Sequence, residues 1–191
     1  MKKTALCSFL CVIAMACLLA CGSQGTGVSA SITTDSLVKK GKYLVNTMGC
    51  NDCHSPKVMT AMGPVPDTSR LLSGHPSNIP LAKIDTAVVK QWVLLNPMLT
   101  NAAGPWGVSF AANLTPDESG IGNWTEEQFS RAMKGGKSKG MQNGRDLLPP
   151  MPRFMQVKDE DVKAIFTYLK SIKPIYNVVP AAIPPGELGK K

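Results

Sequence analysis

Three residues with reactive side chains lie within one short segment, Cys50-Asn51-Asp52-Cys53-His54. Two thiols three positions apart can each add to a vinyl group of a porphyrin, and the C-x-x-C-H spacing is the attachment signature of c-type haem. The imidazole that directly follows the second cysteine is then held beside the iron, where it can serve as an axial ligand. The segment therefore predicts one covalently attached haem c, bound through Cys50, Cys53 and His54.

The same residue types permit two other kinds of site. Zinc is commonly bound by four Cys and His side chains, and His75 could complete such a set with the motif. A C-x-x-C pair can also form a redox centre of the thioredoxin type, which requires a strand–helix setting. We favour haem because His54 directly follows Cys53, and because the surrounding sequence has helix and loop character.

The second axial ligand is expected to be a methionine. A thioether is a soft ligand that favours ferrous iron and raises the reduction potential. Among the ten methionines, Met151 is the candidate, because the prolines in Pro149-Pro150-Met151-Pro152 restrict the backbone of a loop that can cross the opposite haem face. Met141, Met155, Met59 and His75 are the alternatives.

The N-terminal segment resembles the signal of a bacterial lipoprotein. Lys2 and Lys3 precede an apolar stretch, 5–20, that is too short to span a bilayer stably, and Cys21 follows it. We expect a signal peptide at 1–20, a lipidated Cys21 with a flexible tether at 21–34, and the folded domain at 35–191. The protein would then be anchored in the cell envelope and face the periplasm. Cleavage at a nearby small residue, without lipid, is the alternative.

Apolar residues recur at helical spacing in four segments, 35–48, 86–95, 125–134 and 159–171. Asp35 or Ser36 is expected to cap the first helix, and Thr125 to cap the third. The segments 57–80 and 98–119 have the Pro and Gly content of loops, and no segment shows a strand pattern. The sequence therefore predicts an all-α fold.

This arrangement resembles the class I cytochromes c, in particular the cytochrome c domains of bacterial dehydrogenase and respiratory electron chains. The resemblance covers about 35–180 and rests on the haem motif, on Gly41 inside the first helix, and on the segments 113–117, 120–125, 149–152, 159–161 and 168–170. Two departures are Lys158, where the family often has a capping Thr, and the presence of only one haem motif.

The resemblance implies further contacts. The first and last helices should cross, with Gly41 meeting the last helix near Tyr168. The carbonyl of Pro64 is the implied acceptor for the second ring nitrogen of His54. The implied contacts of the haem propionates are Trp106, Asn113, Thr115 and Trp124.

The formal net charge is +8 at pH 7, and a group of cations precedes Met151. These side chains could surround the exposed haem edge and attract an acidic face of a redox partner, although a solvated basic loop is the simpler interpretation. An exported, anchored domain is not expected to bind nucleic acid. The group consists of Lys134, Lys137, Lys139 and Arg145.

With both axial positions filled, the iron has no open site for a substrate, which suits one-electron transfer. The sequence thus predicts a membrane-tethered electron carrier with one haem c and His/Met ligation, and no enzyme activity of its own. Two alternatives stay open. A labile Met151 would make the protein a haem enzyme or a sensor of peroxide or gas, and the chain could also be the cytochrome subunit of a dehydrogenase or oxidase complex. Gly22 after Cys21 resembles a sorting signal for the outer membrane.

Overall fold

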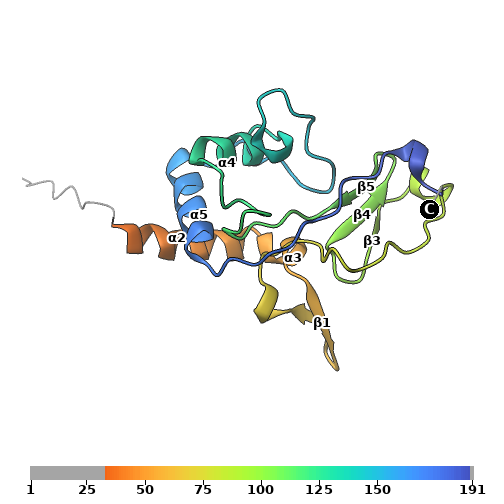
Figure 1. Ribbon diagram of the computed structural model, residues 1–191, viewed down its shortest axis with the longest axis horizontal. Coiled ribbons are helices and arrows are strands. Elements are labelled where there is room, and N and C mark those ends of the chain that lie inside the picture. Colours follow the sequence, from red (N-terminus) through yellow and green to blue (C-terminus); the bar gives the residue numbers. More distant parts are fainter. Residues whose placement is uncertain (1–32, 190–191) are drawn as a thin grey trace, which may run out of the picture. The chain divides into compact units, whose positions relative to one another are not determined.

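The computed structural model describes residues 33–189 (Figure 1). The expected signal peptide, Cys21 and most of the expected tether lie outside this range. The described part contains the helices α2 (Thr34–Thr47), α4 (Glu126–Met133) and α5 (Asp159–Ser171), and the haem motif forms the short helix α3 (Cys50–His54). No helix within residues 33–189 combines the length and the apolar character that crossing a membrane requires.

Helices α2 and α5 cross and touch, as the sequence predicts. A Cβ atom placed on Gly41 would lie 2.0 Å from the carbonyl oxygen of Ala164 and 2.7 Å from the Cβ of Tyr168. The glycine is therefore required by the close approach of the two helices, which offsets its cost of about 1 kcal/mol in a helix interior. An ion pair of 2.5 Å between Lys40 and Asp161 also joins them.

The N-terminal caps agree with the sequence at one helix and differ at another. Thr125 accepts a hydrogen bond from the backbone N–H of Gln128 at 3.1 Å, which confirms the expected cap of α4. The cap of α2 is Thr33, whose hydroxyl accepts from the N–H of Ser36 at 3.3 Å, so the expectation of Asp35 or Ser36 is wrong. The helix begins at Thr34, one residue before the expected segment 35–48.

The larger hydrophobic core lies among α2, α4 and α5. Each helix buries one face in it, and the partly buried side chains of Met48 and Cys50 pack against its margin. The haem motif therefore begins at the edge of this core. Its buried members are Val45, Leu72, Ile121, Phe129, Met133, Val162, Ile165 and Leu169.

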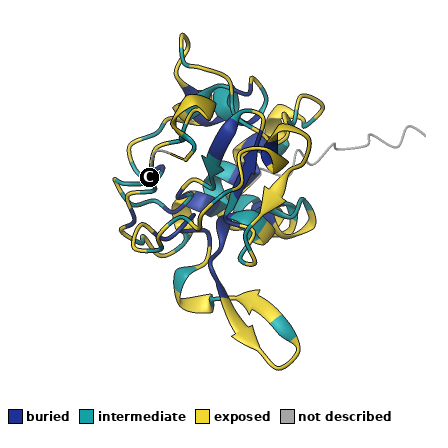
Figure 2. Ribbon diagram, turned by 90° about the vertical axis from the view of Figure 1, so that its right-hand side faces the viewer, coloured by how far each residue is buried: buried dark blue, intermediate teal, exposed yellow. Residues whose placement is uncertain are grey.

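Two small antiparallel sheets show that the all-α prediction is wrong in part. The first is the hairpin of β1 (Lys57–Thr60) and β2 (Gly63–Pro66), in which Lys57 pairs with Pro66. Figure 2 shows most of this hairpin exposed. The second sheet has the order β3-β4-β5, formed by β3 (Leu94–Leu95), β4 (Asn101–Gly104) and β5 (Gly107–Phe110). Gly63 and Gly107 have φ values of 107° and 97°, which suit the turns that begin β2 and β5.

The helix expected at 86–95 is absent, and this prediction is wrong. The segment contains only the 3-10 turn η2 (Val88–Lys90), after which Leu94 and Leu95 pair with Ala103 and Ala102 of β4. Short apolar runs with several β-branched residues fit either a helix or a strand, and here pairing with β4 decides the outcome. The remaining 3-10 turns are η1 (Thr68–Arg70), η3 (Ser138–Gly140) and η4 (Pro185–Glu187).

Candidate functional site

The two cysteines of the motif lie one helical turn apart on α3, so their thiols share one side of this helix. Gly49 connects α2 to α3 with a φ of 73°, a left-handed conformation that glycine adopts without strain. Cys50 packs against the larger core, and both thiols are free and partly buried. This placement presents two thiols side by side for attachment to one planar group.

The state of these thiols argues against a thioredoxin-type centre. Burial raises the pKa of Cys50 to about 11, and burial also raises the pKa of Cys53. Redox-active C-x-x-C pairs instead have a lowered thiol pKa. The zinc alternative also lacks support, because residues 33–189 contain no group of three or more Cys, His, Asp or Glu side chains placed to hold a metal ion.

His54 is oriented by a main-chain carbonyl. Its side chain is 8% exposed, and Nδ1 lies 2.8 Å from the carbonyl oxygen of Ala112, to which it donates. The Nε2 atom is then the acceptor nitrogen, as in metal-binding histidines whose other ring nitrogen is hydrogen-bonded. Burial lowers the pKa of His54, which favours the neutral imidazole that binds metals.

The expected acceptor, the carbonyl of Pro64, is wrong. Pro64 is exposed in β2, where it pairs with Met59, because the hairpin carries residues 57–66 away from His54. The segment after β5 takes this place, and it is held by a bond of 2.9 Å from the N–H of His75 to the carbonyl of Ala111. No side-chain signal in the sequence marks Ala112, because the contact uses only its backbone.

Met151 lies in the loop between η3 and α5. The carbonyl of Pro149 accepts a hydrogen bond of 2.6 Å from the Ser109 hydroxyl, which ties this loop to β5. Met151 is 36% exposed, whereas the alternatives Met141, Met155 and Met59 are 58%, 66% and 68% exposed. Its ligation to iron stays a prediction, and its smaller exposed fraction favours it over these three methionines.

Two of the residues implied to contact the propionates have other partners. The Asn113 side chain donates to the carbonyl of Ile175 at 2.8 Å and accepts from the Thr115 hydroxyl at 2.8 Å. Thr115 in turn accepts from the N–H of Ile175 at 3.1 Å. Asn113 and Thr115 therefore join their loop to the C-terminal tail. Trp124 is partly buried against the larger core.

Two buried ring nitrogens have no hydrogen-bond partner within the described part of the chain, Nε1 of Trp106 and Nε2 of His75. His75 is fully buried, with its Nδ1 2.9 Å from the Thr100 hydroxyl and its ring 4.9 Å from that of Phe110. An unpaired buried polar nitrogen costs about 1–3 kcal/mol, so each atom is suited to a polar group that a ligand brings. Haem carries two carboxylates, which are groups of this kind.

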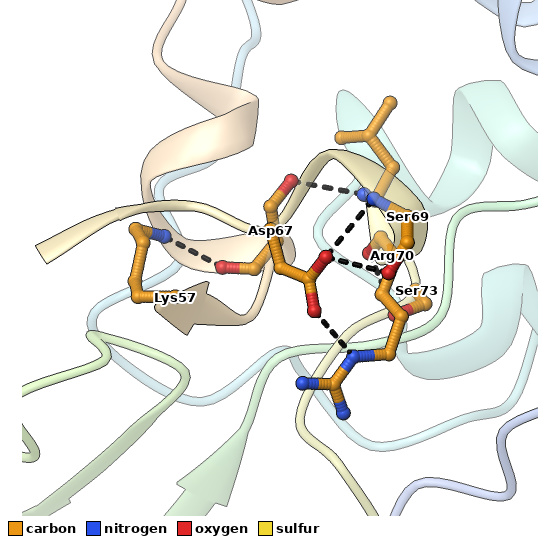
Figure 3. Close-up of polar contacts among 7 residues, drawn as sticks. Lys57, Asp67, Ser69, Arg70 and Ser73 are labelled. Carbon is orange, nitrogen blue, oxygen red and sulfur yellow. Dashed lines mark hydrogen bonds and ion pairs between the residues drawn. The ribbon is translucent and has the colours of Figure 1, made fainter. Parts of the chain in front are cut away.

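The loop that follows β2 is organised by the carboxylate of Asp67, as Figure 3 shows. One oxygen accepts from the N–H and the hydroxyl of Ser69, at 2.9 Å and 2.6 Å, and the other accepts from Nε of Arg70 at 2.8 Å. The bonds from Ser69 and then Arg70 lower the pKa of Asp67 from 3.8 to about 2. The loop leads to Gly74, whose N–H donates to the carbonyl of His54 at 2.8 Å.

Replacement of Asp67 by Asn is expected to destabilise the protein in a pH-dependent way. Because folding lowers the pKa of Asp67, the carboxylate stabilises the folded state above pH 3.8, and this stabilisation is lost as the pH falls toward 2. Urea unfolding of wild type and Asp67→Asn near neutral pH and near pH 2.5 measures the difference in free energy of unfolding. The difference should shrink at acid pH, and a pH-independent difference would contradict this account.

The basic residues before Met151 are partly neutralised. Lys134 pairs with Asp159 at 2.5 Å, and Lys137 pairs with Asp146 at 2.9 Å. Arg145 donates to the carbonyl of Asp146 at 2.8 Å, and Lys139 is exposed. Since two of the four cations have intramolecular carboxylate partners, less positive charge is left to attract a partner than the sequence indicates.

The family model of cytochrome c matches residues 38–173 of this chain. Over 145 residues, the chain is 31% identical to the gluconate 2-dehydrogenase cytochrome c subunit of Pantoea cypripedii, an alignment that covers 74% of this chain and 24% of that protein. It is 26% identical to the cytochrome c subunit of the alcohol dehydrogenase (quinone) of Gluconobacter oxydans, over 74% of this chain and 23% of that protein.

A shorter match, of 40% identity over 80 residues, is to a nicotinate dehydrogenase subunit of Pseudomonas putida, and it covers 40% of this chain and 6% of that protein. The aligned part is thus about a quarter or less of the length of each of these relatives. The family match extends from α2 to α5 and includes the C-x-x-C-H motif, which implies covalent haem c. This chain belongs to the cytochrome c family of electron-transfer proteins.

Proposed function

We propose that this protein is a single-electron carrier in which one haem c is attached to Cys50 and Cys53 and is ligated by His54 and Met151. The observation that carries the proposal is the buried, neutral His54, whose Nδ1 donates to Ala112 and whose Nε2 is left as a ligand. When bound, the haem supplies an iron that changes by one electron between its ferrous and ferric states. Cys50 and Cys53 would hold the group, and the core among α2, α4 and α5, against which Cys50 packs, would exclude water beside the Cys50 attachment.

We also assign the two unpartnered nitrogens to this site. Nε1 of Trp106 would donate to one carboxylate of the haem, and Nε2 of His75 would donate to the other in the tautomer whose Nδ1 accepts from the Thr100 hydroxyl. Trp106 is one of the residues that the family resemblance implies for this role. His75 would then act as a binding residue and not as an iron ligand.

The expected partners are redox proteins. The relatives named above are subunits of dehydrogenases, and we propose that this chain exchanges electrons with a dehydrogenase or with the next carrier in its chain. Lys139 and Arg145 are the cations of the expected basic group that are left for an acidic docking face, since Lys134 and Lys137 pair within the molecule.

For the location, we propose a periplasm-facing protein that is held in the cell envelope by lipid on Cys21. The support is the sequence of residues 1–21, with a short apolar stretch between Lys3 and Cys21. Gly22 favours the outer membrane over the inner one. Radiolabelled fatty acid incorporated by the wild type and not by Cys21→Ala would test the anchor.

The test of the axial ligand is Met151→Ala. Loss of the thioether should remove the weak near-infrared sulfur–iron band and lower the reduction potential by on the order of 100 mV, within the roughly 0.8 V range that axial ligands control. Met155→Ala is the matched control, because Met155 lies in the same loop and is 66% exposed. An unchanged spectrum in Met151→Ala would exclude this ligand.

A haem enzyme or gas sensor is the second candidate, and the 36% exposure of Met151 is the observation that favours it. A labile ligand in an accessible loop would open one axial position. Carbon monoxide added to the reduced wild-type protein discriminates between the two functions. Ready binding supports the enzyme or sensor, and absence of binding supports the carrier.

A further inference from the structure

The amine of Lys57 is buried against the backbone of the haem-binding helix. Lys57 is 8% exposed and directly begins β1, and its Nζ donates to three carbonyl oxygens. The acceptors are Asn51 at 3.2 Å, Asp52 at 2.8 Å and Ser55 at 2.6 Å. Asn51 and Asp52 lie between the two cysteines of α3, and Ser55 follows His54. One side chain thus binds the backbone on both sides of the haem ligands.

These three bonds match a charged amine. An ammonium group has three hydrogens, one for each of the three acceptors within hydrogen-bond distance, whereas a neutral amine has two. Burial lowers the pKa of Lys57, while the nearby Asp52 carboxylate raises it. Carbonyl groups at the end of a helix carry partial negative charge, which favours the cationic form further.

We propose that Lys57 is a positioning residue that fixes the haem-binding helix and raises the reduction potential of the haem through its buried positive charge. The inference rests on the proposed haem site and extends it. Oxidation of the iron adds one positive charge to the site, and a fixed cation nearby makes this change less favourable. A unit charge at a separation of about 10 Å changes a one-electron equilibrium by roughly tenfold at an effective dielectric constant of about 20.

The positioning role follows from the geometry of the same bonds. The last carbonyl groups of a helix have no partner within the helix, and in α3 the ammonium of Lys57 supplies one. The Ser55 hydroxyl adds a bond of 3.0 Å to the Asn51 side chain and accepts from the N–H of Leu72 at 2.9 Å. Lys57 and Ser55 together hold the backbone on either side of His54, and this fixes the position from which the imidazole extends.

The experiment compares midpoint potentials of purified haem-loaded variants. Lys57→Met keeps the apolar stem and removes the charge, and it is expected to shift the redox equilibrium about tenfold toward the ferric form, a decrease of about 59 mV for one electron. Lys57→Arg keeps the charge and should stay close to the wild-type potential. Lys90→Met is the matched control, because Lys90 is exposed in η2, and its potential should be unchanged.

Asp52→Asn gives a test with the opposite sign. Asp52 is exposed on α3, so the substitution removes a negative charge without loss of packing and should raise the potential. It also keeps the electrostatic part testable if Lys57→Met does not accumulate with haem. An unchanged potential in either Lys57→Met or Asp52→Asn overturns the electrostatic role, and an equal decrease in Lys57→Arg and Lys57→Met shows a role in packing alone.

The two proposals fail in different ways. If the wild-type protein has no covalent haem, the proposed carrier function fails. If the wild type has haem c with the sulfur–iron band, and Lys57→Met has the same potential, only the inference about Lys57 fails. The near-infrared spectrum of each variant is recorded as well, because a charge effect leaves the axial ligands in place.

Discussion

Gly41→Leu is expected to prevent α2 and α5 from packing together and to destabilise the protein by at least about 3 kcal/mol, the upper part of the usual range for overpacking. Even the first atom of any side chain at this position would lie 2.0 Å from the carbonyl oxygen of Ala164. That carbonyl belongs to the backbone of α5, so no rotation of a side chain can relieve the overlap. The free energy of unfolding, measured with urea on haem-loaded protein, checks the prediction.

The matched control for this variant is Lys42→Leu. Lys42 is the next residue of the same helix and is exposed, so leucine there has the same propensity without the overlap. It should change the free energy of unfolding by less than about 0.5 kcal/mol, as surface substitutions usually do. If the two variants unfold at the same urea concentration, the contact of the helices is not what Gly41 provides.

Substitution of both Cys50 and Cys53 by Ala is expected to abolish covalent attachment of haem. No other cysteine lies among residues 33–189, so no second thioether can form in the described domain. Intact mass spectrometry should find the polypeptide without the mass of haem, and the denatured protein should lose its haem absorbance on extraction with acid and organic solvent. The double variant would also lose the contact of the Cys50 side chain with the larger core.

Single substitutions separate the contributions of the two thiols to haem attachment. Cys50→Ala or Cys53→Ala leaves one thiol and should retain haem through one bond, with a reduced yield. Asp52→Asn changes a residue between the two cysteines without removing a thiol, and its mass should include one haem. A double variant that still retains haem after denaturation would refute attachment through the motif.

The features that the sequence predicts well are those encoded within one local segment. The C-x-x-C-H motif is contiguous, and the helices α4 and α5 follow from apolar residues at helical spacing and, for α4, from Thr125 as cap. Gly41 could be interpreted because a glycine inside an amphipathic helix is costly unless another backbone comes close. Lys158 has no side-chain capping bond, in agreement with the departure from the family at that position.

The features that the sequence predicts poorly depend on pairing between distant segments. β3 has two residues and exists only because β4 lies beside it, so its leucines fit a helix equally well in isolation. Strand β2 contains both Pro64 and Pro66, which are typical of loops, so the sequence alone does not indicate that it pairs with β1. The bonds that join Asn113 and Thr115 to the tail at Ile175 also connect distant segments, and the haem contacts that the family resemblance implies for these two residues stay a prediction.

The bond from His54 to Ala112 has a consequence for tolerance to substitution. The acceptor is an amide oxygen, which every amino acid has, so replacing the exposed side chain of Ala112 leaves the acceptor in place. In the proposed site, the hydrogen bond that orients the His54 imidazole is therefore unaffected by most substitutions at Ala112. Only a shift of the main chain, such as an insertion or deletion between Phe110 and Asn113, would remove that bond.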